Sequence, residues 1–171
     1  WLNVNDNHPK FSEEEKKHIL KKLNEALSFE TFLHSKYVGQ KRFSIEGVDA
    51  VIPGLDTLIQ KGSEKGIEQF VVGMAHRGRL NVLANIFGKS PEAIFSEFDS
   101  KEYDEEELFD GDVKYHMGWT SFRETDKGKK VRMDLAPNPS HLETVNAVVE
   151  GISRAKVDNK LQGDAKKILP I

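Results

Sequence analysis

Histidine and arginine gather in three short strings of this 171-residue chain: GMAHRGRL at 73–80, GDVKYHMG at 111–118 and NPSHLE at 138–143. A guanidinium offers a planar fork of donors that matches two phosphate oxygens at once. An imidazole carries a proton near neutral pH or donates a hydrogen bond to a carboxylate. The residue types in these strings therefore indicate a site for an anionic, phosphorylated ligand.

The first string lies where α/β proteins commonly bind phosphate. His76 and Arg77 follow the strand-like run FVVGM and precede the helix-like run RLNVLANIFG. Phosphates bind where the carboxyl end of a strand meets the N-terminus of a helix, so Arg77 is the natural anion clamp. By itself, HRGR is equally consistent with a solvated pair, Arg77 and Arg79. His116 and His141, taken singly, are more typical of hydrogen-bonded structural histidines than of catalytic ones.

Five strings taken together resemble one enzyme family. FLHSKYVGQKRFSIEG, GMAHRGRLNVLANI, GDVKYHMG, NPSHLE and ILPI occur in the order and spacing of the thiamine diphosphate-dependent first component of 2-oxoglutarate dehydrogenase complexes. The resemblance covers nearly the whole chain after the first two dozen residues. A coincidental match of five strings in register is very improbable.

The resemblance implies an activity, its cofactors and its partners. It implies the oxidative decarboxylation of 2-oxoglutarate in the tricarboxylic acid cycle, with thiamine diphosphate and Mg²⁺ as cofactors. The succinyl group then passes to a lipoyl group on dihydrolipoyl succinyltransferase, and the full-length protein is expected to form a homodimer. The alternatives are a 2-oxoglutarate decarboxylase, a carboligase or a 2-oxoadipate dehydrogenase of the same family, or a non-enzymatic phosphate-binding α/β module.

The resemblance also implies roles for individual residues. Arg77 matches the arginine that contacts the diphosphate of the cofactor. His76 and His116 match two active-site histidines, catalytic and substrate-binding, near the substrate carboxylate. Three further positions match the lining of the cofactor pocket: Ser140, His141 and Leu142. Of these, Ser140 is also expected to contact the substrate, and as a hydroxyl at a helix start it is equally typical of an N-cap.

No residue of the chain is expected to bind metal. In the family, the Gly-Asp motif that holds magnesium begins a few residues after the ILPI string, and Gly163-Asp164 lies in a polar loop before that string. The chain begins at Trp1 without a methionine and ends in an apolar run, KILPI. From these ends we expect an excised piece. Because the family's metal ligands and second domain are not in this sequence, we expect the piece to be inactive by itself.

Composition narrows the classes of protein without selecting one. The net charge is −3, which disfavours nucleic acid as a partner, and the absence of cysteine excludes disulfides and thiolate metal sites. No apolar run approaches the roughly 18 residues of a membrane span. We therefore expect a protein of the bacterial cytoplasm, or of the mitochondrial matrix if the source is eukaryotic, without a membrane or nucleic-acid partner.

Helical and extended patterns alternate along the chain, which predicts the α/β class. The resemblance narrows this to a partial thiamine diphosphate-binding fold, the first half of the phosphate-binding domain, after a helical linker. The predicted divisions are a polar tail or linker at 1–11, a helical linker at 12–47 and an incomplete α/β domain at 48–171.

Local signals place the remaining elements. Ser12 and Glu15 form a capping-box signature at the start of an amphipathic helix. A second helix is expected at about 48–59, bent near Pro53, and a strand at 68–73. The turn at 126–128 suits a hairpin between extended segments at 113–116 and 130–136, and a further helix is expected to open at Ser140.

Overall fold

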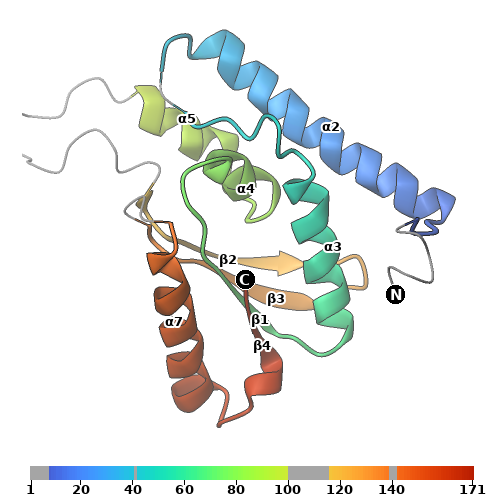
Figure 1. Ribbon diagram of the computed structural model, residues 1–171, viewed down its shortest axis with the longest axis vertical. Helices are drawn as coiled ribbons and strands as arrows, with labels where there is room; N and C mark the ends of the chain where they lie inside the picture. The colour runs from blue at the N-terminus through green and yellow to red at the C-terminus, as the bar shows by residue number, and fades with distance from the viewer. Residues whose placement is uncertain (1–7, 41, 100–115, 139–141) are drawn as a thin grey trace, which may run out of the picture.

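The protein forms a four-stranded mixed sheet, seen in a computed structural model that describes residues 8–40, 42–99, 116–138 and 142–171 (Figure 1). The strand order is β2-β3-β1-β4. β1 pairs in parallel with β3 and with β4, whereas β2 pairs antiparallel with β3. The bounds are Gln69–Val72 for β1, Trp119–Glu124 for β2, Lys130–Leu135 for β3 and Ile168–Pro170 for β4.

Helices connect and cover these strands. Their bounds are Glu13–Lys36 for α2, Val51–Glu64 for α3, Arg79–Asn85 for α4, Pro91–Asp99 for α5 and Thr144–Lys160 for α7. A short 3₁₀ helix, Ala165–Lys167, leads from α7 into β4. Helices alternate with parallel strands, so the chain has the mixed α/β architecture that the sequence predicts.

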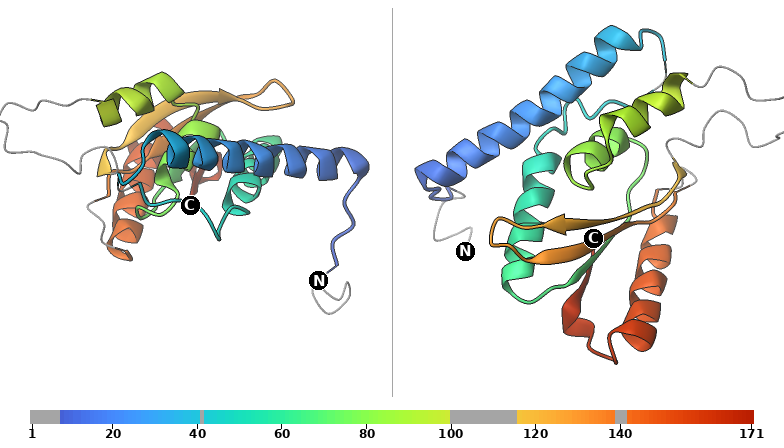
Figure 2. Two further views of the ribbon diagram at one scale, coloured as in Figure 1. Left: turned by 90° about the horizontal axis from the view of Figure 1, so that it is seen from above. Right: turned by 180° about the vertical axis from the view of Figure 1, so that it is seen from behind.

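The sheet separates two apolar cores. Phe70 and Val72 of β1 face a core shared with α2, α3 and α4, whereas Val71, between them, faces a smaller core with Val145 and Val149 of α7. Successive side chains of a strand point to opposite faces, so this alternation fixes which helices cover which face. Figure 2 shows α2 lying across α3 and α4, far from α7.

The capping box predicted for the first helix is confirmed. The Ser12 hydroxyl accepts from the backbone N–H of Glu15 at 3.1 Å, and the Glu15 carboxylate accepts from the backbone N–H of Ser12 at 2.9 Å. These two bonds satisfy donors that the first turn of a helix leaves without intrahelical partners. They determine where α2 starts.

Three element predictions need correction. The second helix is unbroken from Val51 to Glu64, because Pro53 lies in its first turn, where a missing N–H costs nothing. The strand paired with β3 is Trp119–Glu124, and residues 113–115 lie outside the described part of the chain. The last helix begins at Thr144 after a turn at Leu142 and Glu143, later than predicted.

The division of the chain at residue 48 stays a prediction. Ala26 and Leu33 of α2 belong to the same core as Phe70 of the sheet.

Within the described ranges, no helix combines the length and apolar character that crossing a membrane requires.

Candidate functional site

The KRFSIEG string packs directly against the HRGR string. The Phe43 and His76 rings lie 4.1 Å apart between centroids, tilted by 40°. The Phe43 carbonyl accepts from the backbone N–H of Gly78 at 2.8 Å, and the Ser44 carbonyl accepts from Nη1 of Arg77 at 3.3 Å. The loop after β1 is thus held by a segment more than thirty residues earlier in the chain.

Gly78 makes this close approach possible. Its φ is +72°, and an added Cβ would lie 2.6 Å from Cγ1 of Ile45. Any larger residue at this position would be strained by the left-handed backbone and would collide with Ile45. The glycine of HRGR is therefore needed for this packing contact.

His76 and Arg77 differ in solvent exposure and in their hydrogen-bond partners. Nδ1 of the half-buried His76 is inaccessible to solvent and has no hydrogen-bond partner among the described residues. Arg77 is exposed, with one bond to a carbonyl. A buried polar atom without a partner is uncommon, and an exposed guanidinium can still bind an anion. The exposed guanidinium of Arg77 therefore retains capacity for a ligand, whereas Nδ1 of His76 is a buried polar atom without a partner among the described residues.

The sheet brings the other two strings to the same edge. Val72 is level with Leu135 in the parallel pair β1–β3, and Trp119 is level with Leu135 in the antiparallel pair β2–β3. The segment after β1, the segment before β2 and the segment after β3 therefore leave the sheet side by side. We call this end of the sheet the site edge; His76 follows β1 there and His116 precedes β2 there.

Hydrogen bonds join these segments. The backbone N–H of Asn138 donates to the carbonyl of His116 at 3.0 Å, and Nδ2 of Asn138 donates to the carbonyl of Met74. The asparagine side chain is 1% exposed, and its Oδ1 has no partner among the described residues. The NPSHLE string is thus bonded at its first residue to the strings that carry His116 and His76.

Arg79 bonds to the same segments. It is 0% exposed, and its guanidinium donates to the carbonyls of Met74 at 3.1 Å, Met117 at 2.9 Å and Ala136 at 2.8 Å. Burial lowers its pKa to about 10, so the guanidinium stays charged at neutral pH. From the sequence alone, Arg79 is assigned no role and is considered only as part of a solvated pair with Arg77. The available signal was a charged residue opening a largely apolar run, LNVLANIF.

The remaining predicted residues are placed less completely. His116 is half-buried at the site edge, and Leu142 is 68% exposed. Ser140 and His141 lie outside the described residues. The structure therefore brings the segments of His76, Arg77 and His116 to one place, while the roles of Ser140, His141 and Leu142 stay predictions.

Curated proteins similar to this chain share one name. A 2-oxoglutarate dehydrogenase E1 component of Cupriavidus necator is 49% identical over 99% of the chain, and one of Azotobacter vinelandii is 45% identical over 95%. A 2-oxoglutarate dehydrogenase E1/E2 component of Corynebacterium glutamicum is 48% identical over 95%. The chain belongs to the 2-oxoglutarate dehydrogenase E1 family. The resemblance inferred from five strings is confirmed.

The chain spans only 14–18% of the length of these 2-oxoglutarate dehydrogenase relatives. No model of a protein family matches it. The chain thus corresponds to one segment of these longer relatives.

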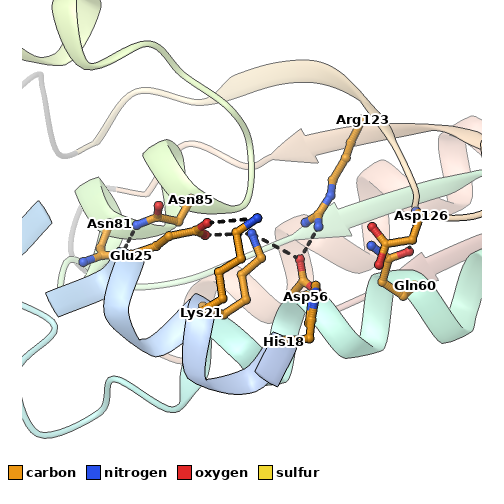
Figure 3. A network of polar contacts seen from close by, with 10 residues as sticks. His18, Lys21, Glu25, Asp56, Gln60, Asn81, Asn85, Arg123 and Asp126 are labelled. Atoms are coloured by element: carbon orange, nitrogen blue, oxygen red, sulfur yellow. Dashed lines mark hydrogen bonds and ion pairs between the residues drawn. The ribbon is translucent and has the colours of Figure 1, made fainter. Parts of the chain in front are cut away.

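A second polar cluster in this E1-family segment lies at the opposite end of the sheet. Asp56 of α3 is 0% exposed and pairs with His18 of α2 at 2.7 Å, with Lys22 of α2 at 3.9 Å and with Arg123 of β2 (Figure 3). We call these four residues the Asp56 cluster. Burial alone would raise the pKa of Asp56, but hydrogen bonds from Arg123 and His18 and the nearby cations lower it below 3.8. The cluster therefore fastens α2 to α3 and the sheet.

Proposed function

We propose that this segment forms part of the cofactor and substrate site of a thiamine diphosphate-dependent 2-oxoglutarate dehydrogenase. The observation that carries the proposal is the meeting of the His76, Arg77 and His116 segments at the carboxyl ends of parallel strands. Open α/β sheets bind ligands at that end. The names of the three relatives support the substrate and the reaction class.

The residues present fit the diphosphate end of the cofactor. The exposed guanidinium of Arg77 offers paired donors to phosphate oxygens, and Nδ1 of His76 is buried without a partner among the described residues. When bound, thiamine diphosphate supplies the carbanion and the electron sink for decarboxylation. The chain's own part is to hold the anion and to present imidazoles to the substrate carboxylate. We assign no Mg²⁺ ligand to these residues.

Two further features of the full-length protein follow as proposals. A lipoyl-bearing dihydrolipoyl succinyltransferase would accept the succinyl group, and the Corynebacterium relative, whose name joins E1 and E2, is consistent with such an association. The partial thiamine diphosphate-binding fold would be completed by the rest of the full-length chain and by a second copy of it.

Calorimetry on the full-length protein tests the role of Arg77. Arg77→Ala should weaken thiamine diphosphate binding by about 1.5–3 kcal/mol, the value of a charge-assisted hydrogen bond, or about 10- to 150-fold. Arg154→Ala is a matched control, because Arg154 is a highly exposed arginine on α7 that pairs with Asp158. Equal cofactor affinity in the wild type and the Arg77 variant would contradict the assignment.

Turnover assays separate the proposed activity from its alternatives. The wild-type protein is given 2-oxoglutarate or 2-oxoadipate, each with and without a lipoyl acceptor. Acceptor-dependent consumption of 2-oxoglutarate supports the proposal. Release of carbon dioxide without any use of the acceptor points instead to a decarboxylase or carboligase, and preference for 2-oxoadipate points to the longer-chain enzyme. Phosphate binding without turnover of either acid would support the non-enzymatic phosphate-binding module instead.

A further inference from the structure

Within the described part of the chain, a buried charge at the site edge pairs with no carboxylate. Among the described residues, the guanidinium of Arg79 donates only to main-chain carbonyls, those of Met74, Met117 and Ala136. A buried charge is costly unless donors and acceptors around it are satisfied, and well-packed apolar side chains are often at least as stabilising. Arg79 is therefore a poor choice for stability alone.

Each of the three carbonyls lies next to one of the three strings that meet at the site edge. Met74 lies two residues before His76, Met117 directly follows His116, and Ala136 lies two residues before Asn138, the first residue of NPSHLE. A guanidinium is planar and rigid, so its donors hold their acceptors in a fixed mutual geometry. One side chain thus sets the separation of three segments that have no covalent link near the site.

Asn138 makes two further hydrogen bonds to these segments. Its Nδ2 donates to the same Met74 carbonyl that accepts from Arg79, and its backbone N–H donates to the carbonyl of His116. The Met74 carbonyl accepts from both side chains, so a shift of the loop after β1 would disturb both at once.

We propose that Arg79 is a positioning residue that holds the described residues after β1, before β2 and after β3 in their binding geometry, with Asn138 as its partner. The inference rests on the proposed function, since it assigns to these segments the cofactor and the substrate. Arg79 itself touches neither. A displacement of about 1 Å in such groups lowers rates by about a hundredfold. The gain in catalysis from a fixed geometry therefore offsets the cost in stability of burying the charge.

Arg79→Lys in the full-length protein is the direct test. An ammonium is a point charge that cannot span three carbonyls, so the segments lose their common anchor while the charge is kept. Both the Kd for thiamine diphosphate and the KM for 2-oxoglutarate should rise, by about ten- to a hundredfold. Arg77→Ala, by contrast, should raise the Kd for the cofactor much more than the KM for the substrate.

Asp56→Asn is the matched control for lost stability. Asp56 is also a fully buried charged residue, but its partners lie at the opposite end of the sheet. It should lower the melting temperature and leave Kd and KM unchanged. If Arg79→Lys lowers the melting temperature equally and also leaves both constants unchanged, the positioning role is refuted while the proposed function stands.

A wild-type protein that neither binds thiamine diphosphate nor turns over 2-oxoglutarate would instead refute the proposed function. Should Arg79→Lys fail to fold, Asn138→Ala decides, because it removes one donor to Met74 and keeps the guanidinium. A joint rise of Kd and KM in that variant supports the inference, and unchanged constants refute it.

Discussion

Arg77 and Arg79 are two residues apart and have opposite environments. Arg77 is exposed with one carbonyl contact, whereas Arg79 is 0% exposed with three. Helix α4 begins at Arg79, and Gly78 before it has a left-handed φ of +72°, so Arg77 lies outside the helix and its side chain need not follow that of Arg79. The exposed guanidinium is free to meet a ligand, and the buried one organises the backbone around it.

His116 should contribute to substrate choice rather than to stability. In the full-length protein, His116→Ala should lower kcat/KM for 2-oxoglutarate far more than it lowers the melting temperature. The distal carboxylate is the group that the imidazole would recognise, so discrimination against 2-oxovalerate should relax. The measurement is the ratio of kcat/KM values for the two acids, with melting temperatures in parallel. An unchanged ratio with a large drop in melting temperature would make His116 a structural residue.

At the scale of elements, the contact between the segment at 42–47 and the loop after β1 depends on Gly78. Gly78→Ala should cost about 1–2 kcal/mol for the left-handed backbone, plus the displacement of Ile45. Gly88→Ala is the matched control, since its φ is +68° and nothing lies within 4 Å of an added Cβ. Chemical denaturation should show the larger loss for Gly78→Ala. Equal losses would mean that the Ile45 contact adjusts freely.

The Asp56 cluster should make the packing of α2 sensitive to acid. The pKa of Asp56 is lowered in the folded protein, so its contribution is complete above its ordinary value of 3.8 and is lost as the pH falls through the lower folded value. Asp56→Asn should cost about 3–5 kcal/mol at neutral pH, because it leaves the partly buried Lys22 and Arg123 without this carboxylate partner.

Denaturation curves measured from pH 7 down to pH 2 test this dependence. The difference between wild type and Asp56→Asn should be constant from pH 7 to pH 5 and shrink below pH 4. A difference that shrinks between pH 7 and pH 5 would show that another group dominates the cluster.

For the whole molecule, the segment is small beside its relatives. The 171 residues span 14–18% of their length, and catalysis depends on groups preorganised around the reacting atoms. We expect the 171-residue chain alone to release no carbon dioxide from 2-oxoglutarate and to bind thiamine diphosphate only weakly. Carbon dioxide assays and calorimetry on the purified chain, beside the full-length protein, measure this. Turnover by the chain alone would show that it contains a complete site.

The sequence by itself determined the family, the α/β class and the position of His76 and Arg77 after a strand, whereas it placed His116 in an extended segment and the structure places it before β2. These depend on local order: a capping box, a buried strand run and motifs read residue by residue. Ser140, His141 and Leu142 were also assigned to the pocket because their string matches the family. Such a match identifies corresponding positions but gives no information on their geometry.

Tertiary structure alone decided that Arg79 is buried, that Phe43 packs on His76 and that Asn138 bonds to the segment before β2. These contacts join residues far apart in the chain, and pairing of the strands selects them. β2 was misplaced for the same reason: Phe122 lies on its exposed face, beside Lys130 and Arg132, so its apolar pattern did not mark the buried side. Local periodicity reports what a residue prefers, whereas the sheet decides which distant groups it meets.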